Sequence, residues 1–440
     1  MEVSSSSAAA EVPHYFLCPI SLEVMRDPVT LATGITYDRA SIDRWLFTDG
    51  HATCPVTRRA LAPAEMDATP NHTLRRLIQA WCAAHQVERF PTPRPPLDSC
   101  RVAALLDEGR HGGDRQAAAA LREIKAVVAE SERNRRCVEA TPGAVDFLAS
   151  LVAKHSSTSN DSSSKRASGQ QDAADADFVL DSPTSTSSPA EDALGVLYSL
   201  KPSERSLAQI MERDGDFLDA LASVLRRPSY RSRAYGILLL KAMTPVLTPA
   251  RLMTVSAGLV QEVVRVVSDR VSSKAVRAAL HVLCRLCPWG RNRVKAVEAG
   301  AVAALVELLL DEGGRRVSEL AVVAMDHLCG CAEGRSELVA HPAGLAVVSK
   351  KVMRVSVVAT ESAVRALHAV AKHSATPSVL QEMLAVGVVA KLLMVLQVNA
   401  GERAGLRAKE MLKTHARVWN LEGLAMPPRL QTYLRDSYPC

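Results

Sequence analysis

The sequence predicts a small α+β module followed by a long all-α solenoid, and three observations carry that prediction. Short β-branched stretches and two helical patterns share the N-terminal part of the chain. A proline-rich segment, residues 90–96, then separates this module from the rest. Beyond it, helical patterning repeats at intervals of about 42 residues. The 440 residues are 48% hydrophobic but only 4% aromatic, so Ala, Val and Leu on helices are expected to form the core.

A β-hairpin and a helix are predicted at the centre of the N-terminal module. Residues 29–31 and 35–37 are β-branched or aromatic, and they flank the turn sequence Thr33-Gly34. Asp38 or Thr36 is expected to cap the helix that follows. Three apolar residues recur at helical spacing in that helix before Gly50 ends it: Ile42, Trp45 and Leu46.

A second helix of the module is predicted to begin at Pro70 and Asn71. Its apolar residues are expected to share one face, namely Leu74, Leu77, Ile78, Trp81 and Cys82.

Two loops beside these helices begin with Cys-Pro, at Cys18 and at Cys54, and are similar to the paired loops of a RING finger. A structural zinc site takes four Cys or His ligands, which usually come in close pairs. Only seven Cys or His residues lie in this module, and no two form a Cys-x-x-Cys pair. The sequence therefore predicts a module without metal, and no cofactor is expected.

The module resembles a U-box, the zinc-free relative of the RING found in E3 ubiquitin ligases. Residues 11–87 carry Cys-Pro-Ile, Asp-Pro-Val, Gly-Ile-Thr-Tyr-Asp-Arg and Cys-Pro-Val-Thr-Arg in that order. In that family, hydrogen bonds and ion pairs replace the metal ions. The resemblance implies such a network from Glu23, Asp27, Asp38, Arg39 and Arg44, with Arg59 as a further candidate.

The same resemblance implies a docking site for an E2 enzyme that carries ubiquitin as a thioester. The implied contact residues are Ile20 and Leu22 in the first loop, Trp45 in the helix, and Pro55 and Arg58 in the second loop. Arg58 stands where the family keeps a cation that orients the E2 and ubiquitin together, a task that suits the fixed donors of a guanidinium. No catalytic nucleophile is implied. Core burial is the alternative role for Ile20, Leu22 and Trp45.

The second part of the chain is predicted to consist of helical repeats. A glycine between a small and an apolar residue recurs through it, at positions 143, 215, 258, 300, 344 and 387. Such glycines are expected to form sharp corners between helices. Helices are predicted over residues 258–267 and 273–286, 300–310 and 317–328, and 387–396 and 403–419. This half resembles about six armadillo repeats, and the order of the parts resembles the plant U-box/armadillo ubiquitin ligases.

The first glycine interval is about 30 residues too long because residues 155–189, rich in Ser, Asp, Thr and Ala, interrupt the first repeat. This segment is predicted to be an unpacked insertion and a candidate phosphorylation segment. The expected domains are a tail at 1–10, the U-box at 11–87, a linker at 88–100, the array at 101–420 and a tail at 421–440.

Composition limits the partners and the compartment. A net charge of +6 over 440 residues does not indicate a nucleic-acid binder. Neither a signal peptide nor an apolar run of membrane-spanning length is present, and the ten cysteines form no regular framework. We expect a cytoplasmic protein, with the nucleus as a second location, whose partners are an E2, ubiquitin and a protein substrate.

The array is expected to hold that substrate in a groove lined by third helices. The tetrapeptide Ala-Val-Arg-Ala begins at residues 275 and 363, at the predicted start of such helices. Arg277 and Arg365, with Arg233, are therefore candidate groove residues for an acidic or phosphorylated partner. Solvated helix ends are an equally good interpretation of these cations.

Three alternatives remain open at this stage. A non-catalytic armadillo adaptor, such as a nuclear-import receptor, is disfavoured because Trp and Asn do not recur at the repeat period. Covalent catalysis by Cys18 or Cys54 is disfavoured because only His51 lies nearby in sequence. Metal binding by His281, Cys284 and Cys287 is disfavoured because armadillo helices bury small residues at such spacings.

Overall fold

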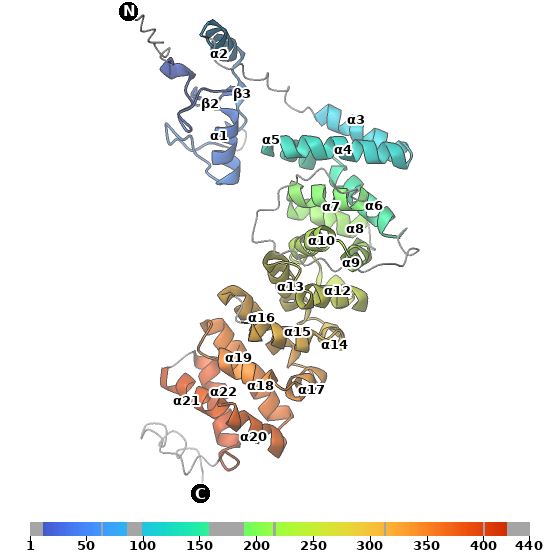
Figure 1. Cartoon of the computed structure of the whole chain (residues 1–440), viewed down its shortest axis with the longest axis vertical. Coiled ribbons are helices and arrows are strands. Elements are labelled where there is room, and N and C mark those ends of the chain that lie inside the picture. The colour runs from blue at the N-terminus through green and yellow to red at the C-terminus, as the bar shows by residue number, and fades with distance from the viewer. Residues whose placement is uncertain are drawn as a thin grey trace, which may run out of the picture. The chain divides into compact units, whose positions relative to one another are not determined.

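The computed structural model describes residues 12–62, 65–85, 99–157, 189–213, 217–311, 314–398 and 401–419 (Figure 1). The chain divides into two units, residues 1–144 and residues 145–440. The described residues do not include the two tails, most of the linker or residues 158–188. The predicted character of the insertion therefore lies outside the described part of the chain. No single described helix has the length and apolarity to cross a membrane, although the bent pair α20(Pro377–Ala385) and α21(Val388–Val398) passes that test jointly.

A three-stranded antiparallel sheet forms the centre of the N-terminal module. Strand β1(Pro28–Thr30) lies between β2(Thr36–Asp38) and β3(Thr69–Pro70). Val29 is paired with Tyr37, and both side chains are fully buried. Gly34 has a φ of 80°, which a residue with a side chain rarely adopts, so it allows the tight turn between β1 and β2. The predicted hairpin is confirmed.

The first helix follows β2 directly. It consists of α1(Arg39–Asp43) and the π-helical turn η2(Arg44–Thr48), and Gly50 beyond it has a positive φ. Asp38 is the residue before the helix, but its carboxylate does not cap it. Its Oδ1 accepts hydrogen bonds from the backbone amides of Arg26 and Asp27, at 2.8 and 2.9 Å, so the predicted side-chain cap is wrong. The carboxylate ties the first loop to the sheet instead.

The module begins with the short 3-10 turn η1(His14–Phe16), and helix α2(His72–Ala84) completes it. Asn71 caps it, since its side chain accepts a hydrogen bond from the Leu74 amide at 3.0 Å. Ile78 and Cys82 are buried, but Leu77 is 52% exposed. The predicted five-residue face is therefore wrong at Leu77, because only a narrow stripe of the helix packs on the small sheet.

Three further helices belong to the first unit: α3(Ser99–His111), α4(Asp114–Glu130) and α5(Glu132–Ala140). Helix α4 packs against both of its neighbours through a face of Ala, Leu, Ile and Val. Ser131 caps α5 by accepting a hydrogen bond from the Asn134 amide.

The second unit is an array of three-helix repeats. Helices α6(Ala144–Ser157) and α7(Pro189–Leu200) lie on either side of the insertion, as predicted. Five sets of three helices follow: α8(Glu204–Arg213), α9(Phe217–Arg226), α10(Tyr230–Met243); α11(Pro249–Met253), α12(Ala257–Ser268), α13(Ser273–Leu286); α14(Asn292–Glu298), α15(Ala301–Leu310), α16(Arg315–Leu328); α17(Ala332–Ala340), α18(Gly344–Lys351), α19(Val357–His373); α20(Pro377–Ala385), α21(Val388–Val398), α22(Glu402–Thr414).

The repeat period appears directly in the hydrogen bonds between neighbouring repeats. Side chains donate to backbone carbonyls 40 residues away from Arg265 to Leu225, from Asn292 to Leu252, and from Arg315 to Val355. Third helices also pack on third helices, from α7 through α10, α13, α16 and α19 to α22. These contacts confirm the armadillo-like stacking, in which each repeat buries its apolar face on the next.

The corner glycines serve two purposes rather than one. Gly143, Gly300 and Gly387 have φ values near 80°, as expected of sharp corners. Gly258 and Gly344 are instead helical, so the prediction of unusual backbone angles is wrong for them. A Cβ on Gly344 would lie 2.0 Å from the Leu338 carbonyl oxygen, so the reason for glycine there is close packing of backbone on backbone.

The described part of the array ends at a buried tryptophan. Helix α22 ends at Thr414 rather than at Trp419 as predicted. Trp419 is only 1% exposed, and its Nε1 donates a hydrogen bond to the Leu380 carbonyl at 2.9 Å. A non-helical turn is therefore needed to bring the ring back against α20.

Candidate functional site

The first Cys-Pro loop is closed by two backbone hydrogen bonds. The Cys18 amide donates to the Glu23 carbonyl, and the Leu22 amide donates back to the Cys18 carbonyl, both at 2.8 Å. Leu22 has a φ of 58°, in the left-handed region, where few residues other than glycine are found. That conformation turns the chain so that the Leu22 side chain is 74% exposed.

The second Cys-Pro loop repeats this arrangement. The Cys54 amide donates to the Arg59 carbonyl at 2.9 Å, and the Arg58 amide donates to the Cys54 carbonyl at 2.8 Å. Arg58 has a φ of 56°. Arg58 therefore takes the same position in the second loop as Leu22 in the first, and both are exposed by the same turn.

The two cysteine sulfurs attach both loops to strand β2. Cys18 Sγ accepts a hydrogen bond from the Asp38 amide at 3.2 Å, while Cys54 Sγ lies 3.1 Å from the Tyr37 hydroxyl and 3.3 Å from that of Thr33. Tyr37 and Asp38 are adjacent, so β2 holds the loops side by side. Cys18 and Cys54 are both fully buried, whereas a thiol that attacks an E2 thioester must be accessible.

The surroundings of these sulfurs favour the thiolate. Burial raises the pKa of the Cys54 thiol, but hydrogen bonds from Thr33, Thr57 and Tyr37 outweigh that effect and lower the pKa to about 6. Burial likewise raises the pKa of Cys18, and hydrogen bonds led by the Ser21 backbone lower it below its usual value. The donors around each sulfur thus stabilise negative charge, as a metal ion would in a RING.

Partly exposed apolar side chains lie on and beside the loops. Ile20 and Trp45 are partly buried and pack against the core of the module, and Pro55 is also half-buried. The Trp45 ring is held by a hydrogen bond from its Nε1 to the Thr53 carbonyl at 2.8 Å and lies 4.1 Å from the His51 ring. Ile20, Trp45 and Pro55 are thus each partly buried against the module and partly exposed to solvent.

The sequence prediction missed Val56, which is 52% exposed. It follows Cys54-Pro55 as Ile20 follows Cys18-Pro19, so comparison of the two loops would have identified it. The predicted site residues Ile20, Leu22, Trp45, Pro55 and Arg58 are thus placed on two parallel loops and the helix that supports the second.

The ion-pair network is smaller than predicted and centres on Asp27. Its Oδ2 accepts from Arg39 Nε at 2.6 Å and its Oδ1 accepts from Arg75 Nη2 at 2.8 Å. All three side chains are 16–17% exposed, so the network is partly shielded from water. It joins the sheet to α1 and α2 at once, because Arg39 begins α1 and Arg75 lies in α2. Sequence analysis missed Arg75.

Several predicted members lie outside that network. Glu23 and Arg44 are exposed and pair with no oppositely charged residue that the structure describes. Arg59 pairs with Glu65 at 2.7 Å on the surface, where such contacts stabilise little. Asp38 belongs to the network only through the backbone amides that it binds.

The candidate groove cations fall into two groups. Arg233 pairs with Asp269 at 2.7 Å, and Arg365 forms an ion pair with the buried Asp326. Arg277 is exposed and has no ion-pair partner in the described part of the array. The repeated tetrapeptide is also out of register, since it begins α13 but lies in the middle of α19.

The surroundings of Cys284 and Cys287, which the sequence analysis considered with His281 as a metal site, do not favour metal binding. Burial raises the pKa of Cys284 and Cys287 to about 12, which disfavours the thiolate that a metal ion would require. Among the described residues, no group of three or more His, Cys, Asp or Glu side chains is arranged to hold a metal ion.

The fold and this site define a module of paired Cys-Pro loops on a small sheet, followed by an armadillo array, and comparison with known proteins agrees. Residues 12–87 match the U-box domain family, and residues 101–432 match the family described as the plant U-box protein ARM repeat region. The chain belongs to the plant U-box proteins with armadillo repeats.

Relatives in Arabidopsis thaliana cover nearly the whole chain. E3 ubiquitin-protein ligase PUB22 is 44% identical over 98% of this chain and 99% of its own length, and PUB23 is 44% identical over 98% of each. PUB24 is 32% identical over 93% of each chain. A solved structure from work on cadherin and beta-catenin matches the fold with a TM-score of 0.54 at 14% identity, covering 78% of this chain and 58% of that one.

Proposed function

We propose that this protein is an E3 ubiquitin ligase of the RING type. The observation that carries the proposal is the pair of equivalent loops, which present Ile20, Leu22, Pro55 and Arg58 at one surface beside Trp45. Membership of a family whose relatives are named E3 ubiquitin-protein ligases supports it. An E2 that carries ubiquitin docks on these side chains, and the array recruits the protein to be modified.

The ligase acts by orientation. Holding the E2–ubiquitin thioester in one reactive pose converts random encounters with a lysine into productive ones, and needs no nucleophile on the ligase. Arg58 suits this role because its guanidinium is exposed and pairs with no carboxylate in the described residues. Its planar set of donors can then bind carbonyls of the E2 and of ubiquitin together.

A reaction with E1, a panel of E2 enzymes, ubiquitin and the full chain tests the proposal. Polyubiquitinated products that require the chain and one or more of the E2s are expected. An absence of transfer with every E2, from a chain whose circular dichroism shows folded helices, would favour the non-catalytic adaptor.

Ubiquitin transfer is expected to survive removal of zinc. Hydrogen bonds to the buried sulfurs and the ion pairs of Asp27 hold the loops in place, so extensive chelation should leave the rate unchanged. The rate is measured against an untreated sample. A loss that zinc alone restores would contradict the expectation.

Self-modification is expected to fall on lysines around the insertion. The first 124 residues contain no lysine, so the module that holds the E2 offers only its N-terminal amine. Lys154 is exposed near the end of α6, and Lys165 lies in the segment whose composition predicts no packing. Mass spectrometry of the self-modified protein identifies the sites. Heavy labelling of Lys241 on α10, with Lys154 and Lys165 unmodified, would contradict this prediction.

A further inference from the structure

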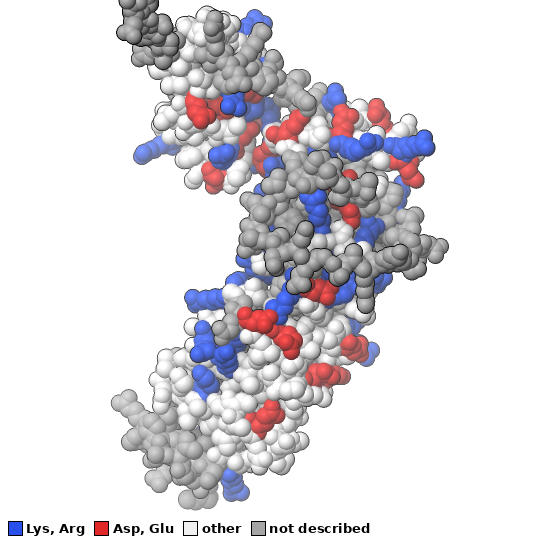
Figure 2. Space-filling view, in the orientation of Figure 1, with Lys and Arg blue, Asp and Glu red and all other residues white. Residues whose placement is uncertain are grey.

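Two neighbouring helices of the array carry only positive charge. Helices α10 and α13, which pack on each other, contain no Asp or Glu in their sequences. Six cations lie on them: Arg231, Arg233, Lys241, Lys274, Arg277 and Arg285. Of these, Arg233 forms an ion pair, with Asp269, and no salt bridge joins the other five to the described carboxylates. In Figure 2, blue side chains lie along the part of the array that holds α13 and α16, with red side chains beside them.

Three cations contribute to the electrostatic environment of one histidine. Burial lowers the pKa of His281 on α13, and the positive charges of Lys241, Arg316 and Arg277 lower it further. These cations come from three successive third helices, α10, α16 and α13. Arg316 has Glu319 of its own helix as a neighbour, but Lys241 and Arg277 have no such compensation among the described residues.

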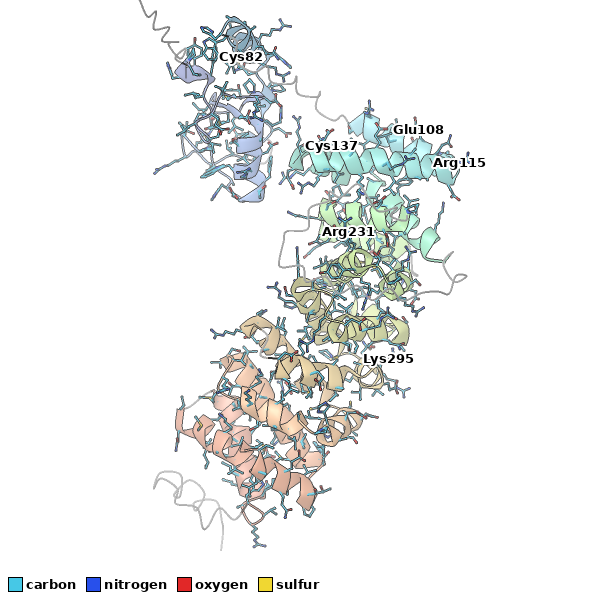
Figure 3. All side chains as sticks on the ribbon, viewed as in Figure 1. Cys82, Glu108, Arg115, Cys137, Arg231 and Lys295 are labelled. Carbon is cyan, nitrogen blue, oxygen red and sulfur yellow. The ribbon has the colours of Figure 1, made fainter. Side chains whose placement is uncertain are left out.

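An aromatic pair extends this region toward the first repeat. The ring of Tyr198 on α7 lies 5.4 Å from that of Tyr235 on α10, and Lys274 Nζ lies 5.8 Å from the Tyr198 ring centroid. Arg231, labelled in Figure 3, also acts electrostatically on Tyr235. We call the side chains of Tyr198, Lys241, Lys274, Arg277, His281 and Arg316 the basic stripe.

Several charges on the last two third helices form ion pairs, unlike Lys241, Lys274 and Arg277 of the basic stripe, for which no salt bridge to a described carboxylate is found. In the last two repeats Arg365 pairs with Asp326, Arg407 lies 3.9 Å from Glu361, and Glu410 accepts from His368. Helices α19 and α22 thus carry several compensated charges, whereas Lys241, Lys274 and Arg277 on α10 and α13 form no salt bridge with a described carboxylate.

We propose that the basic stripe binds an extended acidic segment of the protein to be ubiquitinated. This inference rests on the proposed ligase function and adds the chemistry of its substrate. Neighbouring helix axes lie about 10 Å apart, so three helices span a length that about six residues of extended chain cover. Each exposed charge pair stabilises little alone, so the segment needs several carboxylates, and its affinity depends on salt.

An acidic protein segment fits better than a nucleic acid. The whole chain has a net charge of only +6, and the stripe includes one partly exposed aromatic ring rather than a series on which bases would stack.

Binding is measured by fluorescence anisotropy with the full chain and labelled peptides of about twelve residues, one alternating Glu and Ser and one alternating Gln and Ser. The Glu peptide is expected to bind about tenfold tighter or more, and to lose that advantage as NaCl rises from about 0.05 to about 0.5 M. Equal affinities for the two peptides would overturn the proposal, as would tighter binding of an oligouridine or of vesicles that contain phosphatidylserine.

Two charge-matched double variants locate the site. Lys241→Glu with Arg277→Glu reverses two cations of the basic stripe, whereas Arg205→Glu with Arg354→Glu reverses two exposed cations elsewhere in the second unit. The first pair is expected to weaken Glu-peptide binding by about tenfold or more and the second by less than about twofold. Equal weakening would show a general charge effect and overturn the proposal. Residues 158–188 carry five aspartates. A chain that lacks these residues is expected to show the same dependence of Glu-peptide binding on Arg277, and loss of that dependence would also overturn the proposal.

Transfer assays separate this inference from the proposed function. A lysine-containing test protein carries either the Glu or the Gln peptide as a tag, and discharge of ubiquitin from the E2 to free lysine is followed in parallel. The stripe variant should modify the Glu-tagged protein about as poorly as the Gln-tagged one, with discharge unchanged. Discharge with no preference for the Glu tag in the wild type would overturn the inference alone, and a failure of discharge itself would overturn the ligase function.

Discussion

Arg58→Ala is expected to reduce ubiquitin transfer by about 100-fold or more while E2 affinity falls by less than about threefold. The physical reason is that the Arg58 guanidinium is exposed at the turn of the second loop, whose fold depends on backbone hydrogen bonds and on Cys54 rather than on this side chain. Removing it leaves the apolar docking surface intact but removes the donors that orient ubiquitin. Single-turnover discharge and E2 titration, each on the full chain, measure the two quantities.

Two sets of variants serve as controls for Arg58. Ile20→Ala and Pro55→Ala remove apolar docking surface, so both E2 binding and transfer should fall together, by about tenfold or more. Arg59→Ala is the matched control, because the neighbouring guanidinium pairs with Glu65 on the surface, and it should leave both quantities nearly unchanged. If Arg58→Ala lowered binding and transfer equally, Arg58 would be a docking residue and not an orienting one.

Asp27→Asn is expected to destabilise the U-box by about 2–3 kcal/mol, because it leaves two partly buried guanidinium groups without a charge partner. The loss of the charge partner should cost most at Arg75, because its Nε is already buried without a hydrogen-bond partner. For a module of this size, such a change lowers the melting temperature by about 10–20 °C. Thermal unfolding of the full chain in which Trp289 and Trp419 are replaced by Phe, followed by the fluorescence of Trp45 and Trp81, measures the effect.

Glu23→Gln provides the comparison for Asp27. Both carboxylates were predicted from sequence to belong to one network, but Glu23 is exposed and outside it, so its substitution should shift the melting temperature by less than about 2 °C. Equal shifts for the two variants would mean that the contacts of Asp27 with Arg39 and Arg75 do not stabilise the module.

Sequence patterns predicted the local elements and the repeat order well because neighbouring residues decide them. The turn at Gly34, the cap at Asn71 and the insertion between α6 and α7 all depend on residues close in sequence or on a regular period. The two Cys-Pro loops were recognised for the same reason. Leu22 and Arg58 are exposed by one repeated hexapeptide turn, and the exposed Val56 was not predicted.

Those local patterns could not predict ion pairs between residues that are far apart in the sequence. Arg75 reaches Asp27 across 48 positions, and Arg365 reaches Asp326 across 39, because β-strand and helix packing brings them together. The exposure of Leu77 and the hydrogen bonds of Asp38 likewise depend on tertiary packing. Leu77 lies off the stripe of α2 that packs on the sheet, and the Asp38 carboxylate binds a backbone amide of the preceding loop instead of capping α1.

The sequence by itself determined the two-part architecture and the positions of the two Cys-Pro loops, since each depends on residue types at short or regular spacing. Only the tertiary structure decided which charges are compensated. An ion pair requires two side chains to meet within about 4 Å, and the chain's packing alone sets which ones do. For that reason Arg233, Arg277 and Arg365, equal candidates in sequence, differ in the folded array, where Arg277 is the one without a carboxylate among the described residues.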